Sequence, residues 1–309
     1  MKTRITQLLG IEYPIFQAAM SWASSNAPLV IAVSEAGGLG VLAAGPMRPH
    51  DFSSVLENIK THTKKPYGVN IPLNNPRAPE LLEIAYNARI PVMVASQGGP
   101  KEQLPRFRAI GTKWLHVVAS VEHAKKAEAA GVDALVVDGA EAGGHPPASQ
   151  VTALVLVRRV VKEVKLPVVA SGGAADGAGI AALLALGAEA VQLGTRFIAT
   201  PEASVHEKYK HAVLAADVQD TTLVGPRNLP IRLLRNSFTE KFHASSAMDQ
   251  EALYKSASLK AAALEGDVAN GKVEAGQSAG LVTDIVPAGE LVKRLAAELD
   301  EARRRLAAL

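Results

Sequence analysis

The chain has 309 residues and a formal net charge of +3, with 48% hydrophobic and 20% charged residues. This composition is typical of a soluble globular protein with one large domain, or a domain with an appendage. The absence of cysteine excludes disulfides, thiolate metal sites and cysteine nucleophiles. No basic cluster alternates with aromatic residues and no apolar run is long enough to span a membrane, so we expect neither a nucleic-acid nor a membrane partner. Residues 1–10 lack the apolar core of a signal peptide, so a cytoplasmic location is expected.

Short apolar runs alternate with helix-like stretches from residue 14 to residue 215. The runs predict strands at residues 14–20, 39–43, 67–69, 91–95, 113–118, 134–137, 167–170 and 190–193. The stretches between and after them predict helices at residues 28–36, 51–61, 80–87, 100–110, 121–130, 151–164, 177–186 and 204–215. Eight strand–helix pairs favour an α/β fold of the closed (β/α)8 TIM-barrel type, because an open doubly wound sheet usually has fewer strands.

The alternation stops after Ala216. Residues 227–230 resemble a turn, the segments 233–242 and 249–264 have helical spacing, and residues 266–280 are rich in glycine. A basic helix at 291–309 closes the chain. We therefore predict a barrel at residues 1–215 and a C-terminal helical cap over its mouth at residues 216–309, although the composition would equally suit a side appendage.

The most informative stretch is the predicted strand 134–137 and the loop after it. Asp138 stands where the strand should end, and Gly143, Gly144 and His145 follow. Ligands of parallel α/β folds bind at this carboxyl edge, and glycines let the backbone approach a ligand closely. Histidine changes charge near neutral pH, so His145 is the catalytic candidate, with a structural loop histidine as the alternative. The other histidines show no metal-ligand spacing, so no metal site is predicted.

Two adjacent strand ends carry glycine-rich polar turns, at residues 171–173 and 194–195. After the last two strands of a barrel, such turns and the following helix N-terminus bind phosphate. The alternative is that these glycines only cap short loops. Asn70 and Gln192 also lie at or near predicted strand ends, and their amides suit the alternating donors and acceptors of an isoalloxazine edge. A plain turn residue is the alternative for Asn70.

Three motifs, at residues 138–145, 170–177 and 192–197, together resemble the nitronate monooxygenase family, also called 2-nitropropane dioxygenase. Members of that family are FMN-dependent and barrel-folded, and they include an FMN-type enoyl-acyl-carrier-protein reductase and NADH:quinone reductases. Residues 1–20 and 276–282 resemble the enoyl reductase branch. The resemblance thus covers almost the whole chain, and it implies FMN as cofactor and a catalytic His145 near the flavin. The cofactor-binding residues expected on these grounds are Ala18, Met20, Asn70, Asp138, Gly143, Gly144, Ser171, Gly172, Gly173, Gln192, Gly194 and Thr195.

Some positions depart from the family's usual residues. Where members often have Gln-Gly-Gly-Met or Gln-Ala-Pro-Met, this chain has Gln-Ala-Ala-Met at residues 17–20. Nitronate oxidases commonly carry glutamine at the position of Asp138. The reductase branch tends to have Gly-Asn-Pro where this chain has Gly98, Gly99 and Pro100. These differences affect the expected substrate more than the cofactor.

Three functions follow from these observations. In the first, a nitronate or nitroalkane reduces FMN, dioxygen reoxidises it, and His145 acts as general base. In the second, NADH reduces FMN, which passes hydride to an enoyl thioester or a quinone. The third is a phosphate-binding protein without turnover. The motifs favour the oxidase, because the family name is broadest there and the reductase marker at Gly98 and Gly99 is altered. A small molecule is the expected partner in each case, and a homodimer is compatible with the resemblance.

Overall fold

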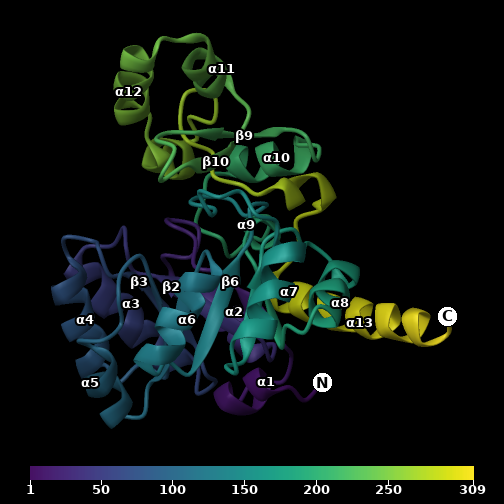
Figure 1. The fold of residues 1–309 in the computed structure, drawn as a ribbon. Coiled ribbons are helices and arrows are strands. Elements are labelled where there is room, and N and C mark those ends of the chain that lie inside the picture. The colour runs from purple at the N-terminus through teal and green to yellow at the C-terminus, as the bar shows by residue number, and fades with distance from the viewer.

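The structure is a computed structural model that describes residues 1–309. Its centre is a closed barrel of eight parallel strands in chain order, which confirms the predicted TIM barrel (Figure 1). The strands are β1 (Ile15–Gln17), β2 (Leu39–Ala43), β3 (Gly68–Pro72), β4 (Val92–Ser96), β5 (Lys113–Val118), β6 (Ala134–Asp138), β7 (Val168–Ser171) and β8 (Ala190–Leu193).

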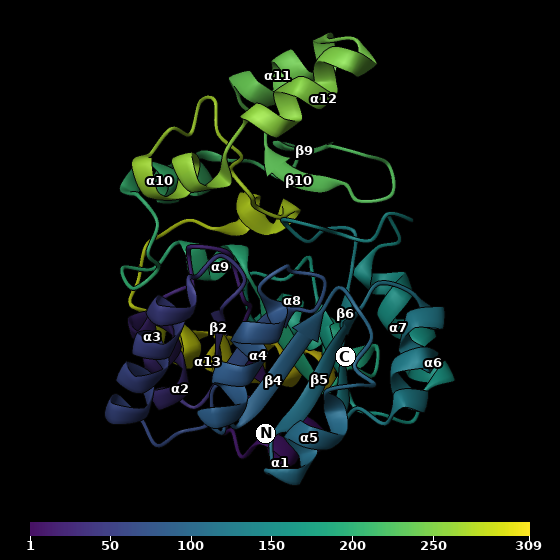
Figure 2. The same cartoon turned by 90° about the vertical axis from the view of Figure 1, so that its left-hand side faces the viewer.

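Seven helices that follow the strands cover the outside of the barrel (Figures 1 and 2). They are α2 (Ala27–Glu35), α3 (Pro49–His62), α4 (Ala78–Asn87), α5 (Leu104–Ala109), α6 (Val121–Ala130), α7 (Ala153–Glu163) and α8 (Gly177–Ala185). After β8, α9 (Thr195–Ile198) lies at the end of the barrel, and α10 (Glu207–Ala215) lies beside the hairpin above it (Figures 1 and 2). None of the helices combines the length and the apolar character that crossing a lipid bilayer requires.

A short helix before the first strand, α1 (Arg4–Leu9), was not predicted. Thr3 and Thr6 form a capping box at its start, in which each side chain accepts a hydrogen bond from the backbone of the other. Ile5 and Leu9 are buried against the apolar side chains inside the barrel. The helix therefore closes the amino-terminal end of the barrel, opposite the predicted site.

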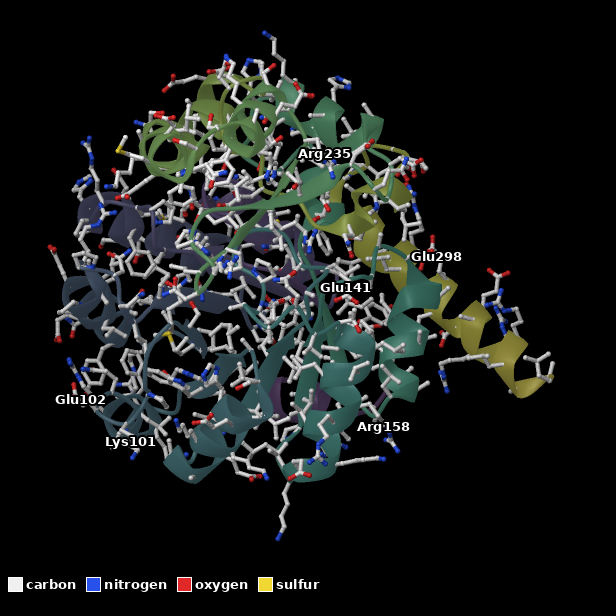
Figure 3. The ribbon with its side chains drawn as sticks, turned by 45° about the horizontal axis from the view of Figure 1, so that its top comes forward. Lys101, Glu102, Glu141, Arg158, Arg235 and Glu298 are labelled. Carbon is white, nitrogen blue, oxygen red and sulfur yellow. The ribbon has the colours of Figure 1, made fainter.

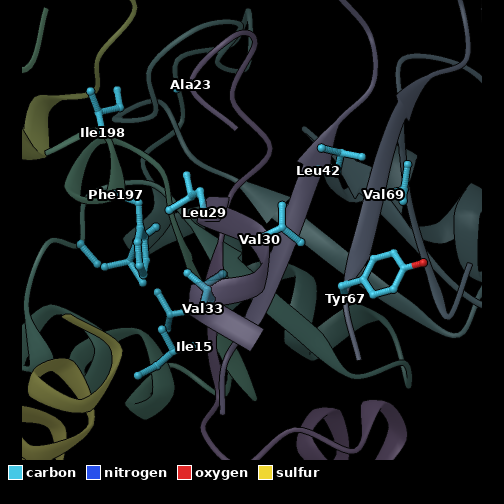
Figure 4. Close-up of a cluster of buried hydrophobic side chains, with 14 of the residues drawn as sticks. Ile15, Ala23, Leu29, Val30, Val33, Leu42, Tyr67, Val69, Phe197 and Ile198 are labelled. Carbon is cyan, nitrogen blue, oxygen red and sulfur yellow. The ribbon is translucent and has the colours of Figure 1, made fainter. Parts of the chain in front are cut away.

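Side chains alternate along each strand between the barrel interior and the outer helices. Phe16, Val94 and Val136 belong to the interior cluster. Ile15 and Leu42 instead pack outward with α2, as Figure 4 shows for Leu29, Val30 and Val33. The same alternation directs the residues at the carboxyl ends of the strands into the opening there, which we call the mouth. Those residues are Asn70, Ser96, Asp138, Ser171 and Gln192.

The segment 216–287 forms a cap at the end of the barrel where the mouth lies (Figure 1). It is not purely helical as predicted, because it begins with an antiparallel hairpin of β9 (Thr221–Val224) and β10 (Ile231–Leu234). The predicted turn at 227–230 lies in that hairpin, but the predicted helix at 233–242 begins only after β10. The rest of the cap contains α11 (Ser237–Ala244), α12 (Ala247–Ser256), a π-helical turn (Ala261–Glu265), an extended strap at 272–276 and a 3-10 turn (Gln277–Leu281).

The last helix, α13 (Ala288–Ala307), leaves the cap and packs against α8 and α2 on the outer wall of the barrel (Figures 1 and 2). Leu291, Leu295 and Leu299 are buried along this contact. The segment predicted as one cap at 216–309 thus has two parts, of which only the first lies over the mouth.

Candidate functional site

Three polar side chains stand side by side on consecutive strands at the mouth. Asp138 is the register partner of Ser171, and Ser171 is the register partner of Gln192. The Gln192 Nε2 atom donates a hydrogen bond to Ser171 Oγ at 3.3 Å. Burial raises the pKa of Asp138 to about 6; a hydrogen bond with Ser171 opposes this shift, and the nearby Glu141 carboxylate adds to it. The mouth therefore contains a carboxyl group that titrates close to the physiological range.

Asn70 lies on β3, away from these three strands, and its amide is held in one orientation. Its Nδ2 atom donates to the Val94 carbonyl at 2.7 Å and to Ser96 Oγ at 3.3 Å. The side-chain oxygens of Asn70 and Gln192 accept no hydrogen bond within the protein. The two predicted amides thus offer free, oriented acceptors to a ligand at the mouth.

The two glycine turns after β7 and β8 have the properties of an anion cradle. Gly172 and Gly173 adopt left-handed backbone angles, with φ of 101° and 81°. The backbone N–H groups of Gly172, Gly173 and Gly194 donate to no acceptor in the protein. A Cβ atom placed on Gly194 would lie 3.6 Å from Met20 Sδ and 3.7 Å from Ala18 Cβ, so these two residues border the second turn. Free backbone donors in this position suit a phosphate group.

Gly143 and Gly144, and the hydroxyl of Thr195, are engaged by the cap. A Cβ atom on Gly143 would come within 2.6 Å of the backbone of Ala275. Gly144 exchanges two backbone hydrogen bonds with Arg232, at 3.2 Å and 2.7 Å. Thr195 Oγ1 accepts a hydrogen bond from the Gly276 N–H at 2.9 Å. The small size of the two glycines is thus explained by close packing of the cap, and the N–H of Gly144 is not free for a cofactor.

His145 follows this contact and remains exposed. Its Nδ1 atom lies 3.2 Å from the Pro230 carbonyl oxygen. Because a carbonyl only accepts, we assign the proton of the neutral ring to Nδ1, which leaves a lone pair on Nε2. Although the residue as a whole is exposed, the protein around the imidazole ring restricts its hydration and lowers the pKa of His145; the Pro230 hydrogen bond opposes this shift, and the Lys272 charge reinforces it. In its neutral form the ring therefore presents a free basic nitrogen.

Glu141, in the middle of the same motif, has a structural role. Its carboxylate oxygens accept hydrogen bonds from the Ala153 N–H at 3.1 Å and 2.8 Å, at the N-terminus of α7. Its carbonyl accepts one from the Gln277 N–H at 2.9 Å. Figure 3 shows Glu141 beside α7 in the middle of the molecule. A carboxylate at a helix N-terminus is stabilised by the helix dipole, whereas the backbone carbonyl of Glu141 links the loop after β6 to the cap.

Arg232 of β10 was not predicted as part of the site. It is buried, and it donates to the Ala140 carbonyl at 3.0 Å, to Thr221 Oγ1 at 3.0 Å and to Gln150 Oε1 at 3.3 Å. These bonds fix the loop that carries His145 to the hairpin of the cap. The sequence feature that could have identified Arg232 is its position between Ile231 and Leu233, as a charged residue inside a short apolar run.

Glu274, on the strap, was also missed. Burial raises its pKa to about 7, and only the charge of Lys272 opposes that shift. A Cβ atom placed on Gly144 would lie 3.3 Å from Glu274 Oε2, so this carboxyl group reaches the residue next to His145. No group of three or more side chains in the protein is arranged to hold a metal ion.

A TIM barrel with free backbone donors after β7 and β8, oriented amides at the mouth and an accessible histidine has the arrangement of a barrel enzyme with its site at the carboxyl ends of the strands. The sequence profile of the Nitronate monooxygenase family matches residues 2–97 and 79–298. The chain belongs to this family, and it is an oxidoreductase enzyme.

Individual members show how broad the family is. FabK from Thermotoga maritima is 40% identical and superposes with a TM-score of 0.94 over 100% of this chain and 99% of its own. A nitroalkane oxidase from Streptomyces ansochromogenes is 32% identical, with a TM-score of 0.85 over 98% of this chain and 100% of its own. The (3aS,4S,5R,7aS)-5-hydroxy-7a-methyl-1-oxo-octahydro-1H-indene-4-carboxyl-CoA dehydrogenase of Rhodococcus jostii is 31% identical over 96% of both chains.

Proposed function

We propose that this protein is an FMN-dependent reductase of enoyl thioesters that takes its electrons from NADH or NADPH. The observation that carries the proposal is the position of Asp138. This carboxyl group, which departs from the glutamine of nitronate oxidases, lies in the mouth where a substrate must bind. The departure from the reductase branch lies at residues 97–99, in the solvent-exposed loop that follows β4 at the same edge of the barrel. We give Asp138 more weight because its carboxyl group is charged and stands among the side chains directed into the mouth, and this reverses the preference that the motifs alone gave.

Charge at the mouth supports the same choice. A nitronate is an anion, and it would bind close to Asp138, whose carboxyl is largely ionised above its pKa of about 6. Like charges at short range repel strongly where water is partly excluded. An enoyl thioester is neutral at its reacting carbons and does not meet this repulsion.

The relatives named above support a thioester substrate. FabK is an enoyl-acyl-carrier-protein reductase, and the Rhodococcus jostii enzyme acts on a CoA thioester. Both align with nearly the whole of this chain. Their common substrate feature is an acyl group carried as a thioester.

The residues present fit FMN. The free N–H groups of Gly172, Gly173 and Gly194 would hold its phosphate, and the free side-chain oxygens of Asn70 and Gln192 would accept hydrogen bonds from its ring. When bound, FMN supplies hydride transfer between the nicotinamide and the substrate. Of the other expected residues, Ala18 and Met20 border the turn at Gly194, and Asp138 and Ser171 stand beside Gln192 on neighbouring strands. Gly143, Gly144 and the Thr195 hydroxyl contact the cap, so we do not assign them to the cofactor.

We expect His145 to donate the proton that the reduction of an enoyl thioester requires. When the β-carbon of an enoyl thioester accepts hydride, the α-carbon must gain a proton. The Nε2 atom of His145 is free to carry that proton, because the Pro230 carbonyl holds the other ring nitrogen. A protonated imidazole with a lowered pKa releases its proton readily.

One observation favours a second candidate, the oxidation of nitroalkanes. The neutral His145 ring has a basic Nε2 atom, which is what removal of a proton from a neutral nitroalkane requires. The nitroalkane oxidase from Streptomyces ansochromogenes shares the fold at 32% identity.

Anaerobic mixing of the FMN-loaded protein with single reductants separates the two candidates. We expect NADH or NADPH to bleach the flavin absorbance within the turnover time, and crotonyl-CoA to restore it. Faster bleaching by propyl-2-nitronate than by either nicotinamide, with no reoxidation by crotonyl-CoA, would overturn the reductase proposal in favour of the oxidase.

A further inference from the structure

The strap at residues 272–276 fixes the backbone of Glu274 from several sides. Glu274 forms an antiparallel bridge with Leu233 of β10. The Tyr209 hydroxyl of α10 donates to the Glu274 carbonyl at 2.9 Å. Two residues further along, the Gly276 N–H donates to Thr195 Oγ1 at 2.9 Å. These contacts therefore fix the backbone of Glu274 next to the loop that carries His145.

The Glu274 carboxylate has no partner in the protein. It makes no hydrogen bond and no ion pair, although Lys272 is only two residues away. The Lys272 ammonium donates instead to the Tyr254 carbonyl at 2.7 Å and lies 3.8 Å from the centre of the Tyr254 ring. Lys272 is thus engaged on the α12 side, and the Glu274 carboxylate is left without a hydrogen-bond or ion-pair partner beside Gly144.

An unpaired carboxylate with restricted hydration destabilises a folded protein, and such groups concentrate at functional sites. We propose that Glu274 is a specificity-determining residue, which disfavours anionic ligands beside the Gly143–His145 loop and admits neutral ligands of the same shape. The expectation that the neutral ligand is an acyl compound rests on the proposed function. The expectation that Glu274 discriminates between charged and neutral ligands does not.

The selection should depend on pH. Glu274 repels anions only when it is ionised, so discrimination should increase as pH rises through about 7 and fall below it. The Lys272 ammonium favours the ionised form, and removing it should move the transition to higher pH. The titratable and charged groups that face Glu274 or its neighbours from the packed elements are Lys272, Tyr254, Tyr209, His145 and Arg232.

The test compares crotonate with crotonamide, two nearly isosteric probes of which only crotonate is charged. Their dissociation constants are measured from the change in flavin absorbance of the FMN-loaded protein, without turnover. At about pH 8.5 we expect Glu274→Gln to bind crotonate about ten-fold more tightly than the native protein does, and crotonamide equally well. At about pH 6, where crotonate is still ionised but Glu274 is largely protonated, the two proteins should differ little.

Three further variants complete the design. Glu240→Gln removes an exposed carboxylate from α11 of the same cap and should leave both constants unchanged. Glu274→Met should behave as Glu274→Gln does, which guards against an effect of the amide or of misfolding. In Lys272→Met, the pH at which discrimination appears should rise.

Equal affinity of the native protein for both probes at about pH 8.5 would overturn the proposal, as would an unchanged ratio in Glu274→Gln. Failure of crotonamide to bind the native protein would also count against it, because the region beside the Gly143–His145 loop would then not admit a neutral acyl group. A protein that NADH and NADPH fail to reduce would refute the proposed reductase, yet the ratio of the two constants would still test Glu274.

Discussion

The rim of the barrel and the cap contribute different kinds of groups to one site. The rim offers backbone N–H groups and amide oxygens, at Gly172, Gly173, Asn70 and Gln192, which are neutral and held by the strands. The cap offers charged side chains from an arrangement with only a small apolar cluster of its own, Val224, Ile231, Leu233, Phe238 and Phe242. The comparison supports a division in which the neutral rim groups would hold the cofactor, while Asp138 and the charged groups of the cap would select the substrate.

The largest expected effect concerns the loop between the two regions. His145→Ala should lower kcat by about 10²–10⁴-fold, the usual contribution of a positioned acid or base. Flavin content should stay near that of the native protein, because the cofactor groups lie on other loops. Steady-state kinetics and the flavin-to-protein absorbance ratio measure the two quantities. His123→Ala, at an exposed position of α6, is the control, and native activity in His145→Ala would remove His145 from the mechanism.

The pH dependence of kcat/KM distinguishes whether His145 donates or accepts a proton. The pKa of His145 is lowered by its limited hydration. If His145 donates a proton to an enoyl thioester, activity should fall as pH rises through that lowered pKa, because the protonated form disappears. If it removes a proton from a nitroalkane, activity should rise over the same range. A profile with no His145-dependent slope would contradict both roles.

The next effect should be confined to the rim. Gly173→Leu should lower FMN occupancy at least about ten-fold, because the side chain would obstruct the anion cradle and the backbone is left-handed at φ 81°. Gly111→Leu is a matched control, since Gly111 has a φ of 87° and no atom within 4 Å of an added Cβ. Absorbance after dialysis against FMN gives the occupancy. Full FMN content in Gly173→Leu would refute the assignment of the phosphate site.

A third change should loosen the cap and spare the rim. Arg232→Met removes three side-chain hydrogen bonds, of which those to Ala140 and Thr221 are buried and that to Gln150 is partly buried. We expect local opening of the hairpin and the His145 loop to become easier by roughly 2–4 kcal/mol. Hydrogen exchange at residues 140–150 and 221–234 measures this, with Arg235→Met at an exposed site as control. An equal loss of protection in β1–β4 would show that cap and barrel unfold together.

The smallest effect is a dependence of stability on pH. Burial raises the pKa of Asp138 from 3.8 to about 6. The folded protein therefore holds this proton more tightly than the unfolded chain does, and its stability should fall as pH rises from about 4 to about 6. Asp138→Asn should remove this part of the slope, worth about 1–2 kcal/mol after allowance for the hydration that the side chain keeps. Denaturant unfolding of the apoprotein across that range provides the measurement, and parallel slopes would contradict the assignment.

The barrel could be predicted because its signals are local. Each buried strand is a short apolar run followed by a polar or glycine turn, so Asp138, Ser171 and Gln192 could be assigned to one edge without coordinates. The hairpin could not, because Leu233, Leu234, Phe238 and Phe242 resemble one face of a helix, whereas pairing with β9 and with the loop after β6 makes the first two a strand. The helix α1 is only six residues long and is stabilised by packing under the barrel.

Glu274 illustrates a different limit. Nothing in a glycine-rich segment indicates that one glutamate will lie beside Gly144 while its neighbour Lys272 turns toward Tyr254. Such an arrangement depends on how distant segments cross, which periodicity and motifs do not encode. The polar groups of the rim could be located from the sequence for the opposite reason, since their placement follows from strand order alone.

The place where the cap joins the barrel has a consequence for how such enzymes diversify. The chain leaves the barrel near Asp217 and returns near Gly280, and these points touch, since a Cβ atom on Gly280 would lie 2.3 Å from the Val218 nitrogen. The intervening segment is therefore a cassette with adjoining ends, a geometry that tolerates insertion and exchange. Because α13 then completes the barrel wall, a replacement cassette would have to match this one junction and the contacts over the mouth. Exchange at this junction would alter the cap and leave the strand ends of the barrel in place.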